Sequence, residues 1–257
     1  MRHRLAGVPA DDAYGWAVGP DGLVLVVADG VGSVVGSGEA ARTAVRVASV
    51  AGVEALGCSA TVSGAPELAT VGPDGAPDPG AADPGAADPG ATDPGATDLD
   101  AADLDAAVRR AIVAAGEALR DGPGATTLVV AAVALDGRGR VARVGDSTAL
   151  VLGAGEWREL FSEADPDGGS MSTLTGALPA ARPEVELADL LIGPGEALVL
   201  VTDGIGDPLR DGPGTVAPAL GAALASAPTP LGLAWVVDFS RQGCHDDRTV
   251  LALWKGA

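Results

Sequence analysis

The sequence of 257 residues predicts an α/β domain with mainly antiparallel sheets. Three observations predict this class: short runs rich in Val, Leu and Ala are bounded by Asp-Gly turns, helical patterns lie between groups of such runs, and two runs are joined by a tight turn. Hydrophobic residues make up 47% of the chain and aromatic residues only 3%, so the core has to be built from small aliphatic side chains.

The first elements are a strand and two helices. The run LVLVVA at 23–28 is short, continuous and apolar and ends at Asp29-Gly30, which indicates a buried strand. The pattern becomes helical from Glu39. A second helix is expected from about Leu104 to Arg120, where apolar residues at steps of three and four form one stripe before Gly122-Pro123-Gly124.

Strands dominate the second half of the chain. Thr126–Leu135 and Arg140–Leu152 flank the turn at Asp136-Gly137 and are expected to form an antiparallel hairpin. Further strands are expected at 196–202 and 249–254, and further helices at about 215–226 and 230–240.

One segment does not fit a packed domain. From Val71 to Asp105, AADPG-like units recur at a five-residue step, with Pro and Gly and no large apolar side chain in each unit. Such a segment cannot bury enough surface to offset its ordering entropy. We therefore expect a single domain over 1–257 with a disordered acidic insertion at 62–103. A tolerated insertion is the favoured interpretation, and an acidic recognition tail is the alternative.

The charge balance excludes some function classes. The chain has 35 acidic and 16 basic side chains, a net charge of −19. Nucleic-acid binding needs clustered Lys and Arg, and an anionic membrane surface would repel this protein, so neither partner is expected. Two cysteines are too few for a disulfide framework. With no signal-peptide pattern and no apolar window long enough to span a membrane, we expect a cytoplasmic protein.

Aspartates recur at the ends of the apolar runs. Asp29 and Asp203 each follow an expected strand, Asp246 precedes one, and Asp146 lies inside the expected strand at 140–152. Charges so close to buried strands are costly unless they are paired or bound to metal. The nearby basic residues are few: Arg143, Arg210, Arg241 and Arg248. One Asp-Gly is typical of a plain turn, but the set favours hard divalent cations with oxygen ligands.

Six motifs, in order, carry a family resemblance: Asp11-Asp12-Ala13, Ala28-Asp29-Gly30-Val31-Gly32, Gly124-Ala125-Thr126-Thr127, Gly145-Asp146-Ser147, Thr202-Asp203-Gly204 with Asp207, and Asp246-Asp247-Arg248-Thr249-Val250. Outside the acidic segment, the chain from about Gly7 to Trp254 resembles the metal-dependent protein phosphatases of type 2C, in their shorter bacterial branch. The resemblance implies a four-layer α+β sandwich, in which two mainly antiparallel β-sheets are flanked by helices.

The resemblance also implies a two-metal centre that holds Mn²⁺ or Mg²⁺ at one end of the sandwich. Asp29 would bridge the two ions and the backbone carbonyl of Gly30 would bind one of them. Asp203 and Asp246 would complete the shell of the other. Asp11 and Asp12 would hold metal-bound waters. The implied catalytic set is Asp12, Asp29, Asp203 and Asp246.

A third, weaker ion is a feature of bacterial relatives, and here it would use Asp146 with Asp207 as a helper. His245, beside Asp246, is read either as a proton-transfer group or as a loop histidine. Asp247 stands where many relatives have Asn and adds charge beside the site.

The chemistry agrees with the residues independently. A phosphate monoester is doubly negative near neutral pH, and a site lined by carboxylates repels it unless bound cations reverse the local field. Two divalent ions lower the pKa of a water between them, so no covalent phosphoenzyme is needed. The chain also lacks the Cys-x5-Arg loop of cysteine phosphatases, because Cys244 is followed by His245, Asp246 and Asp247.

The expected function is therefore a Ser/Thr phosphoprotein phosphatase whose substrate is a phosphoprotein, the product of a bacterial kinase. One departure supports an alternative: relatives place a phosphate-gripping Arg where this chain has Gly7, and Arg4 or Arg2 is the nearest substitute. The alternative is a catalytically weak, phosphatase-like regulatory or binding module. A hydrolase of small-molecule phosphates shares the chemistry and differs only in substrate.

Overall fold

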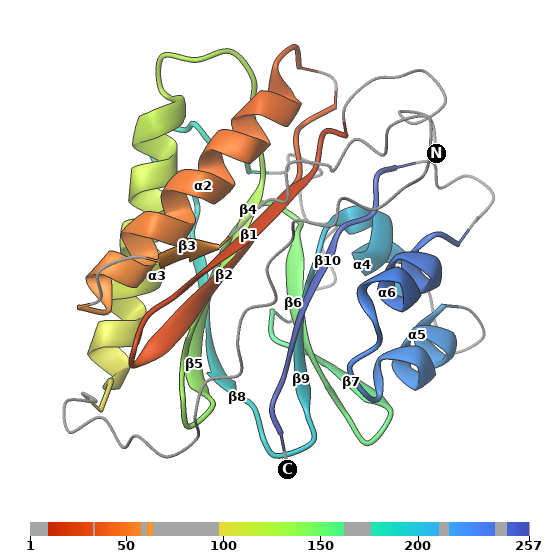
Figure 1. The fold of residues 1–257 in the computed structure, drawn as a ribbon. Coiled ribbons are helices and arrows are strands. Elements are labelled where there is room, and N and C mark those ends of the chain that lie inside the picture. Colours follow the sequence, from red (N-terminus) through yellow and green to blue (C-terminus); the bar gives the residue numbers. More distant parts are fainter. Residues whose placement is uncertain are drawn as a thin grey trace, which may run out of the picture.

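The structure is a computed structural model that describes residues 10–32, 34–57, 61–63, 98–161, 176–210, 216–239 and 246–256. Two sheets lie face to face, with a pair of helices outside the first and three shorter helices outside the second (Figure 1). This is the four-layer sandwich that the resemblance implies, so the predicted fold class is confirmed.

Every strand pair in the two sheets is antiparallel. The first sheet has the order β3-β1-β2-β4-β5-β8, with β1 at Ala13–Val18, β2 at Gly22–Ala28, β3 at Thr61–Ser63, β4 at Leu128–Ala134, β5 at Arg138–Val144 and β8 at Glu186–Leu191. The second sheet has the order β10-β9-β6-β7, with β6 at Thr148–Gly153, β7 at Glu156–Glu159, β9 at Ala197–Val201 and β10 at Val250–Trp254.

The helices form the outer layers. Helices α2 (Ser37–Ala55) and α3 (Ala101–Leu119) lie side by side on the first sheet (Figure 1). Helices α4 (Asp203–Arg210), α5 (Ala217–Leu224) and α6 (Pro230–Val237) lie beside the second sheet. None of the helices in the described ranges is long and apolar enough to cross a membrane.

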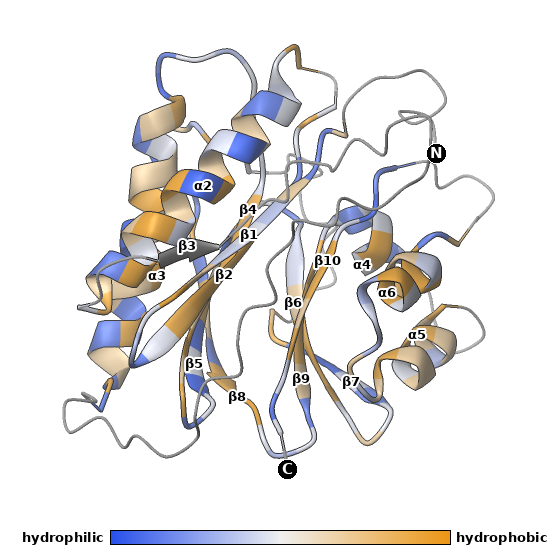
Figure 2. Ribbon diagram, in the orientation of Figure 1, coloured by the Kyte–Doolittle hydropathy of each residue, from blue (hydrophilic) through white to orange (hydrophobic). Residues whose placement is uncertain are grey.

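The two faces of the first sheet serve two cores. Along β2, Val24 and Val26 pack against α2 and α3, whereas Leu25 and Val27 pack against the second sheet, as the period of two along a strand requires. Hydrophobic residues therefore line the sheets and the inward helix faces (Figure 2). Small residues permit close helix packing: a Cβ at Gly52 of α2 would lie 3.1 Å from Val24 Cγ1.

The expected continuous strand at 140–152 is wrong. It is two strands that belong to different sheets, β5 and β6. The chain changes sheet at Gly145, whose φ of 95° is costly for residues with a side chain. A Cβ there would also lie 2.6 Å from the carbonyl oxygen of Gly176. Asp146 therefore lies in the crossover between the sheets and not inside a strand.

The expected insertion at 62–103 is shorter at both ends. Residues 62 and 63 belong to β3, and α3 begins at Ala101. A capping box causes the early start: Asp100 accepts from the backbone N–H groups of Ala102 and Asp103 at 2.7 and 3.0 Å, and the Asp103 carboxylate accepts from the backbone N–H of Asp100. Residues 58–60 and 64–97 lie outside the described residues, so their expected disorder stays a prediction.

Candidate metal centre

Asp29 and Gly30, which follow β2, are fixed through their backbone. The Asp29 carbonyl accepts from the backbone N–H of Thr127 and from the Thr126 hydroxyl, both at 2.8 Å. The Gly30 N–H donates to the Asp11 carbonyl at 3.1 Å. A Cβ at position 30 would lie 2.7 Å from that carbonyl oxygen, so only glycine fits here. The segment before β1 is thereby held against the end of β2.

A threonine joins the two sheets at the same end of the sandwich. The Thr202 hydroxyl, just after β9, donates to Asp12 Oδ2 at 2.8 Å. It also accepts from the backbone N–H of Thr249, just before β10, at 3.1 Å. Asp12 precedes β1 of the first sheet, but its carboxylate is held by Thr202, which follows β9 of the second sheet.

The segment before β10 contacts both Asp11 and the first turn of α4. The Asp247 carboxylate accepts from the backbone N–H of Asp11 at 2.9 Å. The Asp247 carbonyl oxygen lies only 2.0 Å from where a Cβ on Gly204 would be, so the first turn of α4 packs directly on this segment. Asp203, Asp246 and the adjacent Asp11 and Asp12 are thus drawn together from three places in the sequence.

Burial and neighbouring carboxyl groups shift the pKa values of three of these acids. Burial, together with the charges of Asp12, Asp203 and Asp246, raises the pKa of Asp29 to about 10. Burial raises the pKa of Asp12 to about 6, although the hydrogen bond from Asp29 and that from Thr202 oppose the shift. The protonated Asp29 is the donor in this contact.

Asp203 is subject to the same effects. Burial, together with the charges of Asp246, Asp146 and Asp207, raises its pKa to about 6. The largest charge effects on Asp203 therefore come from other carboxylates. At neutral pH such a cluster retains protons unless a cation replaces them.

The comparisons with known proteins bear on this arrangement. The family model described as Protein phosphatase 2C matches residues 1–230. The chain belongs to the protein phosphatase 2C family. A comparison with curated proteins found no match.

Several solved structures share the fold of this chain at low sequence identity. The PPM Ser-Thr phosphatase MsPP from Mycobacterium smegmatis, in complex with cacodylate, is 20% identical with a TM-score of 0.57, over 96% of this chain and 93% of that one. The serine/threonine phosphatase PstP from Mycobacterium tuberculosis is 20% identical with a TM-score of 0.52, over the same shares. RsbX in complex with magnesium is 12% identical with a TM-score of 0.54, over 95% and 86%.

The carboxyl groups of this type 2C phosphatase fit a divalent cation. Asp203 Oδ1 is buried and has no hydrogen-bond partner among the described residues, which is costly for a carboxylate oxygen. The donors are all oxygens, which Mg²⁺ and Mn²⁺ prefer. In the described part of the chain, no three acidic, His or Cys side chains already have the geometry of a metal site. Asp29 is instead hydrogen-bonded to Asp12 and Asp203, as expected for a protonated cluster.

The residues expected at a third ion differ in their surroundings. The Asp146 charge acts on Asp203. The Asp207 charge also acts on Asp203, but the Asp207 side chain is 65% exposed and lies 3.5 Å from Arg210. Arg210 in turn pairs with Glu159 of β7 at 2.6 Å, which fixes the end of α4 to the second sheet. Gly7, Arg2, Arg4 and His245 lie outside the described residues.

Sequence reasoning missed the hydroxyl groups that support the acids. Besides Thr202, Thr127 Oγ1 accepts from the Asp29 backbone N–H at 3.3 Å and lies 2.7 Å from Ser147 Oγ. Thr127 and Ser147 are buried. Thr202 and Ser147 each stand next to an aspartate in the sequence, which was the available signal, but the partners of these hydroxyl groups are 20 to 190 positions away.

Proposed function

We propose that this type 2C phosphatase hydrolyses phosphoserine and phosphothreonine in proteins, with water activated between two Mn²⁺ or Mg²⁺ ions. The single observation that carries the proposal is the buried cluster of Asp12, Asp29 and Asp203, whose pKa values are raised because carboxyl groups crowd one another. Perturbed acids in one cluster are typical of functional sites. A doubly negative phosphate ester would enter such a cluster only with cations present.

The proposed roles follow the placement of each group. Asp29 would hold both ions, the Gly30 carbonyl would hold one of them, and Asp203 and Asp246 would hold the other. When bound, two divalent ions lower the pKa of the water between them and stabilise both oxygens of an in-line displacement. Asp12, held at Oδ2 by Thr202, would orient a water with its other oxygen. Asp29 must release its proton before it can serve as a ligand.

Three further assignments belong to the same proposal. Asp11 would hold a second metal-bound water, since its backbone is fixed on Asp247 and Gly30. Asp146 and Asp207 would hold a third, weaker ion near Asp203. The partner would be a phosphoprotein made by a bacterial kinase, in the cytoplasm. MsPP and PstP, which share the fold, are described as Ser/Thr phosphatases.

The test is release of phosphate from p-nitrophenyl phosphate and from a phosphothreonine peptide in Mn²⁺. We expect activity that EDTA abolishes and that Asp203→Asn lowers by at least about 100-fold, because losing even an outer-shell partner of a metal costs 10- to 100-fold. Asp121→Asn, at an exposed position after α3, is the matched control and keeps full activity. Activity that survives EDTA, or an undiminished Asp203→Asn protein, would contradict the two-metal mechanism.

A second candidate is a regulatory or binding module with little turnover. It is motivated by Gly7, which stands where relatives have the Arg that grips the phosphate. Titration calorimetry separates the two: the module predicts binding of Mn²⁺ or a phosphopeptide, with no phosphate release from a folded preparation. We favour the enzyme because all four acids of the expected catalytic set are present.

A further inference from the structure

One buried threonine holds the backbone of Asp29. Thr127 lies just before β4 of the first sheet and is 3% exposed. Its backbone N–H donates to the Asp29 carbonyl at 2.8 Å, and its hydroxyl accepts from the Asp29 backbone N–H at 3.3 Å. Thr127 therefore binds both polar backbone groups of the residue that would bridge the two ions.

The same side chain contacts both sequence neighbours of Asp146. The Thr127 hydroxyl oxygen lies 2.7 Å from that of Ser147, which is fully buried just before β6 of the second sheet. A Cβ on Gly145 would lie 2.7 Å from Thr127 Cγ2, so the crossover between the sheets packs directly on this threonine. Asp146 is thus held on both sides by contacts with Thr127.

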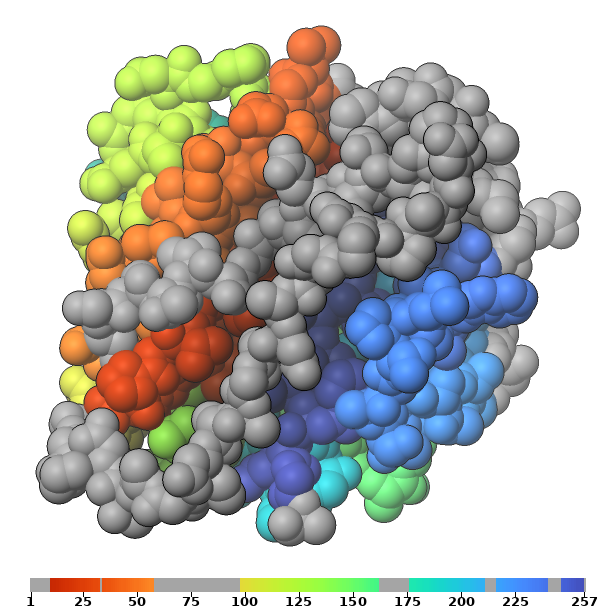
Figure 3. Space-filling view, in the orientation of Figure 1, coloured from red at the N-terminus to blue at the C-terminus, as the bar shows by residue number. Residues whose placement is uncertain are grey.

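The segment that carries Thr127 is itself fixed. The preceding residue, Thr126, exchanges two backbone hydrogen bonds with the buried Leu178, at 2.9 and 2.8 Å. At the surface, the chain between α3 and β4 lies against the beginning of α2, where a Cβ on Gly124 would lie 2.5 Å from the Gly36 carbonyl oxygen (Figure 3). Thr127 is therefore a fixed point against which both aspartates are positioned.

We propose that the hydroxyl pair of Thr127 and Ser147 positions both Asp29 and Asp146, so that the two stronger ions and the weaker third ion depend on this pair together. This inference rests on the proposed function, in which Asp29 bridges two ions and Asp146 holds the third. Thr127 and Ser147 are positioning residues, because they act on the ions through the aspartates. Groups that hold a metal ligand in place typically contribute about 10- to 100-fold to metal affinity.

The hydroxyl pair also joins the two sheets at the acidic cluster. Asp29 follows β2 of the first sheet, and Asp146 lies where the chain crosses to the second. The Asp146 charge acts on Asp203, which is hydrogen-bonded with Asp29. The separation of these carboxyl groups is therefore set by this buried contact as well as by Thr202. Because Mg²⁺ requires nearly ideal octahedral geometry, a small change in that separation lowers affinity.

The test measures Mn²⁺ binding by electron paramagnetic resonance of the free ion, which requires no turnover. We expect Ser147→Ala to weaken both the stronger and the weaker ions by about tenfold, and Thr127→Val by up to about 100-fold. The double variant should bind no more weakly than Thr127→Val alone, because both substitutions remove the same contact. Thr127→Ser retains the hydroxyl and should keep most of the affinity. Asp146→Asn, in contrast, should weaken the third ion only.

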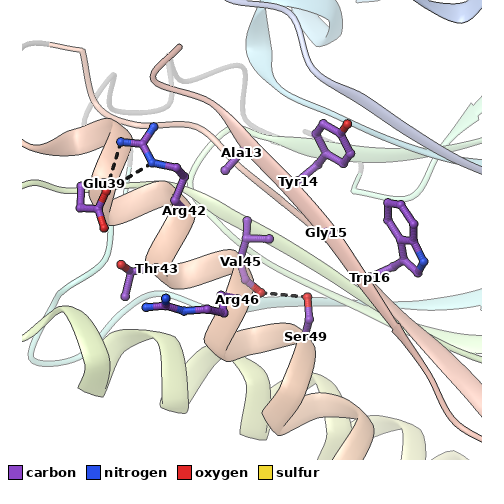
Figure 4. Close-up of a pocket in the computed structure, with 10 residues that line it drawn as sticks. All are labelled: Ala13, Tyr14, Gly15, Trp16, Glu39, Arg42, Thr43, Val45, Arg46 and Ser49. Atoms are coloured by element: carbon purple, nitrogen blue, oxygen red, sulfur yellow. Dashed lines mark hydrogen bonds and ion pairs between the residues drawn. The ribbon is translucent and has the colours of Figure 1, made fainter. Parts of the chain in front are cut away.

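Ser49→Ala is the matched control. Ser49 is 2% exposed in the second half of α2, and its hydroxyl donates to the Val45 carbonyl of the same helix at 2.8 Å (Figure 4). This substitution removes one buried hydroxyl and should leave Mn²⁺ binding unchanged. The inference is overturned if Ser147→Ala weakens only one class of ion or neither, if the effects of Ser147→Ala and Thr127→Val add, or if Ser49→Ala weakens binding equally.

Failure of the proposed function gives a different result. A protein that binds Mn²⁺ but releases no phosphate from p-nitrophenyl phosphate lacks the proposed activity, and the Mn²⁺ measurements still decide the inference. Amide hydrogen exchange of Asp29, followed by NMR in EDTA, tests the positioning without any ion. Exchange should be about fivefold faster in Ser147→Ala, because the Thr127 hydroxyl that accepts from this amide has lost its partner, and unchanged in Ser49→Ala. Equal rates in the wild type and Ser147→Ala overturn the inference, whatever the protein does with phosphate.

Discussion

Asp29 is the residue on which the acidic cluster depends. Burial and the charges of Asp12 and Asp203 raise its pKa to about 10, so at neutral pH it holds a proton that the unfolded chain would release. Its carboxyl group, which carries one proton, is hydrogen-bonded with both neighbouring acids. Any cation that binds here has to replace this proton, which makes cation affinity rise with pH.

The substitution Asp29→Asn keeps a hydrogen-bond donor at this position but removes the carboxylate that would bind a metal ion. The amide has an N–H donor like the protonated acid but requires no proton, so the metal-free variant should melt higher than the wild type at pH 7.5, by roughly 2–4 °C per kcal/mol gained. It should also lose most of the stabilisation that Mn²⁺ gives the wild type. Thermal melts in EDTA and in Mn²⁺ measure both effects, with Asp121→Asn as the control. A full Mn²⁺ response in Asp29→Asn would exclude Asp29 as a ligand.

At the scale of single elements, α4 depends on two glycines with different surroundings. A Cβ on Gly204 would lie 2.0 Å from the Asp247 carbonyl oxygen. A Cβ on Gly206 would make only ordinary contacts, with Thr148 at 3.5 Å and Val201 at 3.7 Å. Gly204→Ala should therefore push the segment before β10 away from Asp203, lower stability by about 1–3 kcal/mol and weaken Mn²⁺ binding. Gly206→Ala should be neutral or stabilising by up to about 1 kcal/mol. Urea unfolding and Mn²⁺ titration compare the pair, and equal behaviour would refute the packing argument.

The same elements show what the sequence could predict. β2, β4 and β9 are continuous apolar runs and α2 and α3 carry long apolar stripes, so pattern alone finds them. β1 and β8 are half-exposed strands with a weaker pattern, and they were not anticipated. α4 was missed because Asp203-Gly204 is typical of a turn and Pro208 lies inside the helix.

The sequence likewise predicts one part of the acidic site and not the other. The ordered acidic motifs predict which carboxylates meet, and the structure brings Asp12, Asp29, Asp203 and Asp246 within electrostatic reach of one another. The contact between Thr202 and Asp12 spans 190 positions and joins the two sheets, so it depends on tertiary packing that no local pattern encodes.

At the scale of the whole molecule, the acidic cluster makes the metal-free protein less stable as pH rises. Asp12 and Asp203 have pKa values of about 6 in the fold, against 3.8 as the ordinary value. The folded protein thus binds more protons than the unfolded chain as pH rises from about 4 through 6, and Asp29 extends this range upward. By linkage, stability falls as pH rises across this window. The surface acids Asp100, Asp105 and Asp136 have lowered pKa values, and their contribution is lost only in more acidic solution.

The metal-free protein should therefore be more stable at pH 5 than at pH 8, and Mn²⁺ should reverse that order. In EDTA the melting temperature falls by several degrees between the two pH values, because Asp12 and Asp203 must ionise inside a buried cluster. With Mn²⁺ in excess the stabilisation grows with pH, because fewer protons compete for the carboxylates. The double variant Asp12→Asn, Asp203→Asn is the control and should show a flatter profile in EDTA. A metal-free melting temperature that rises from pH 5 to pH 8 would show that the folded cluster is not protonated, and the physical case for a cation at this end of the sandwich would fail with it.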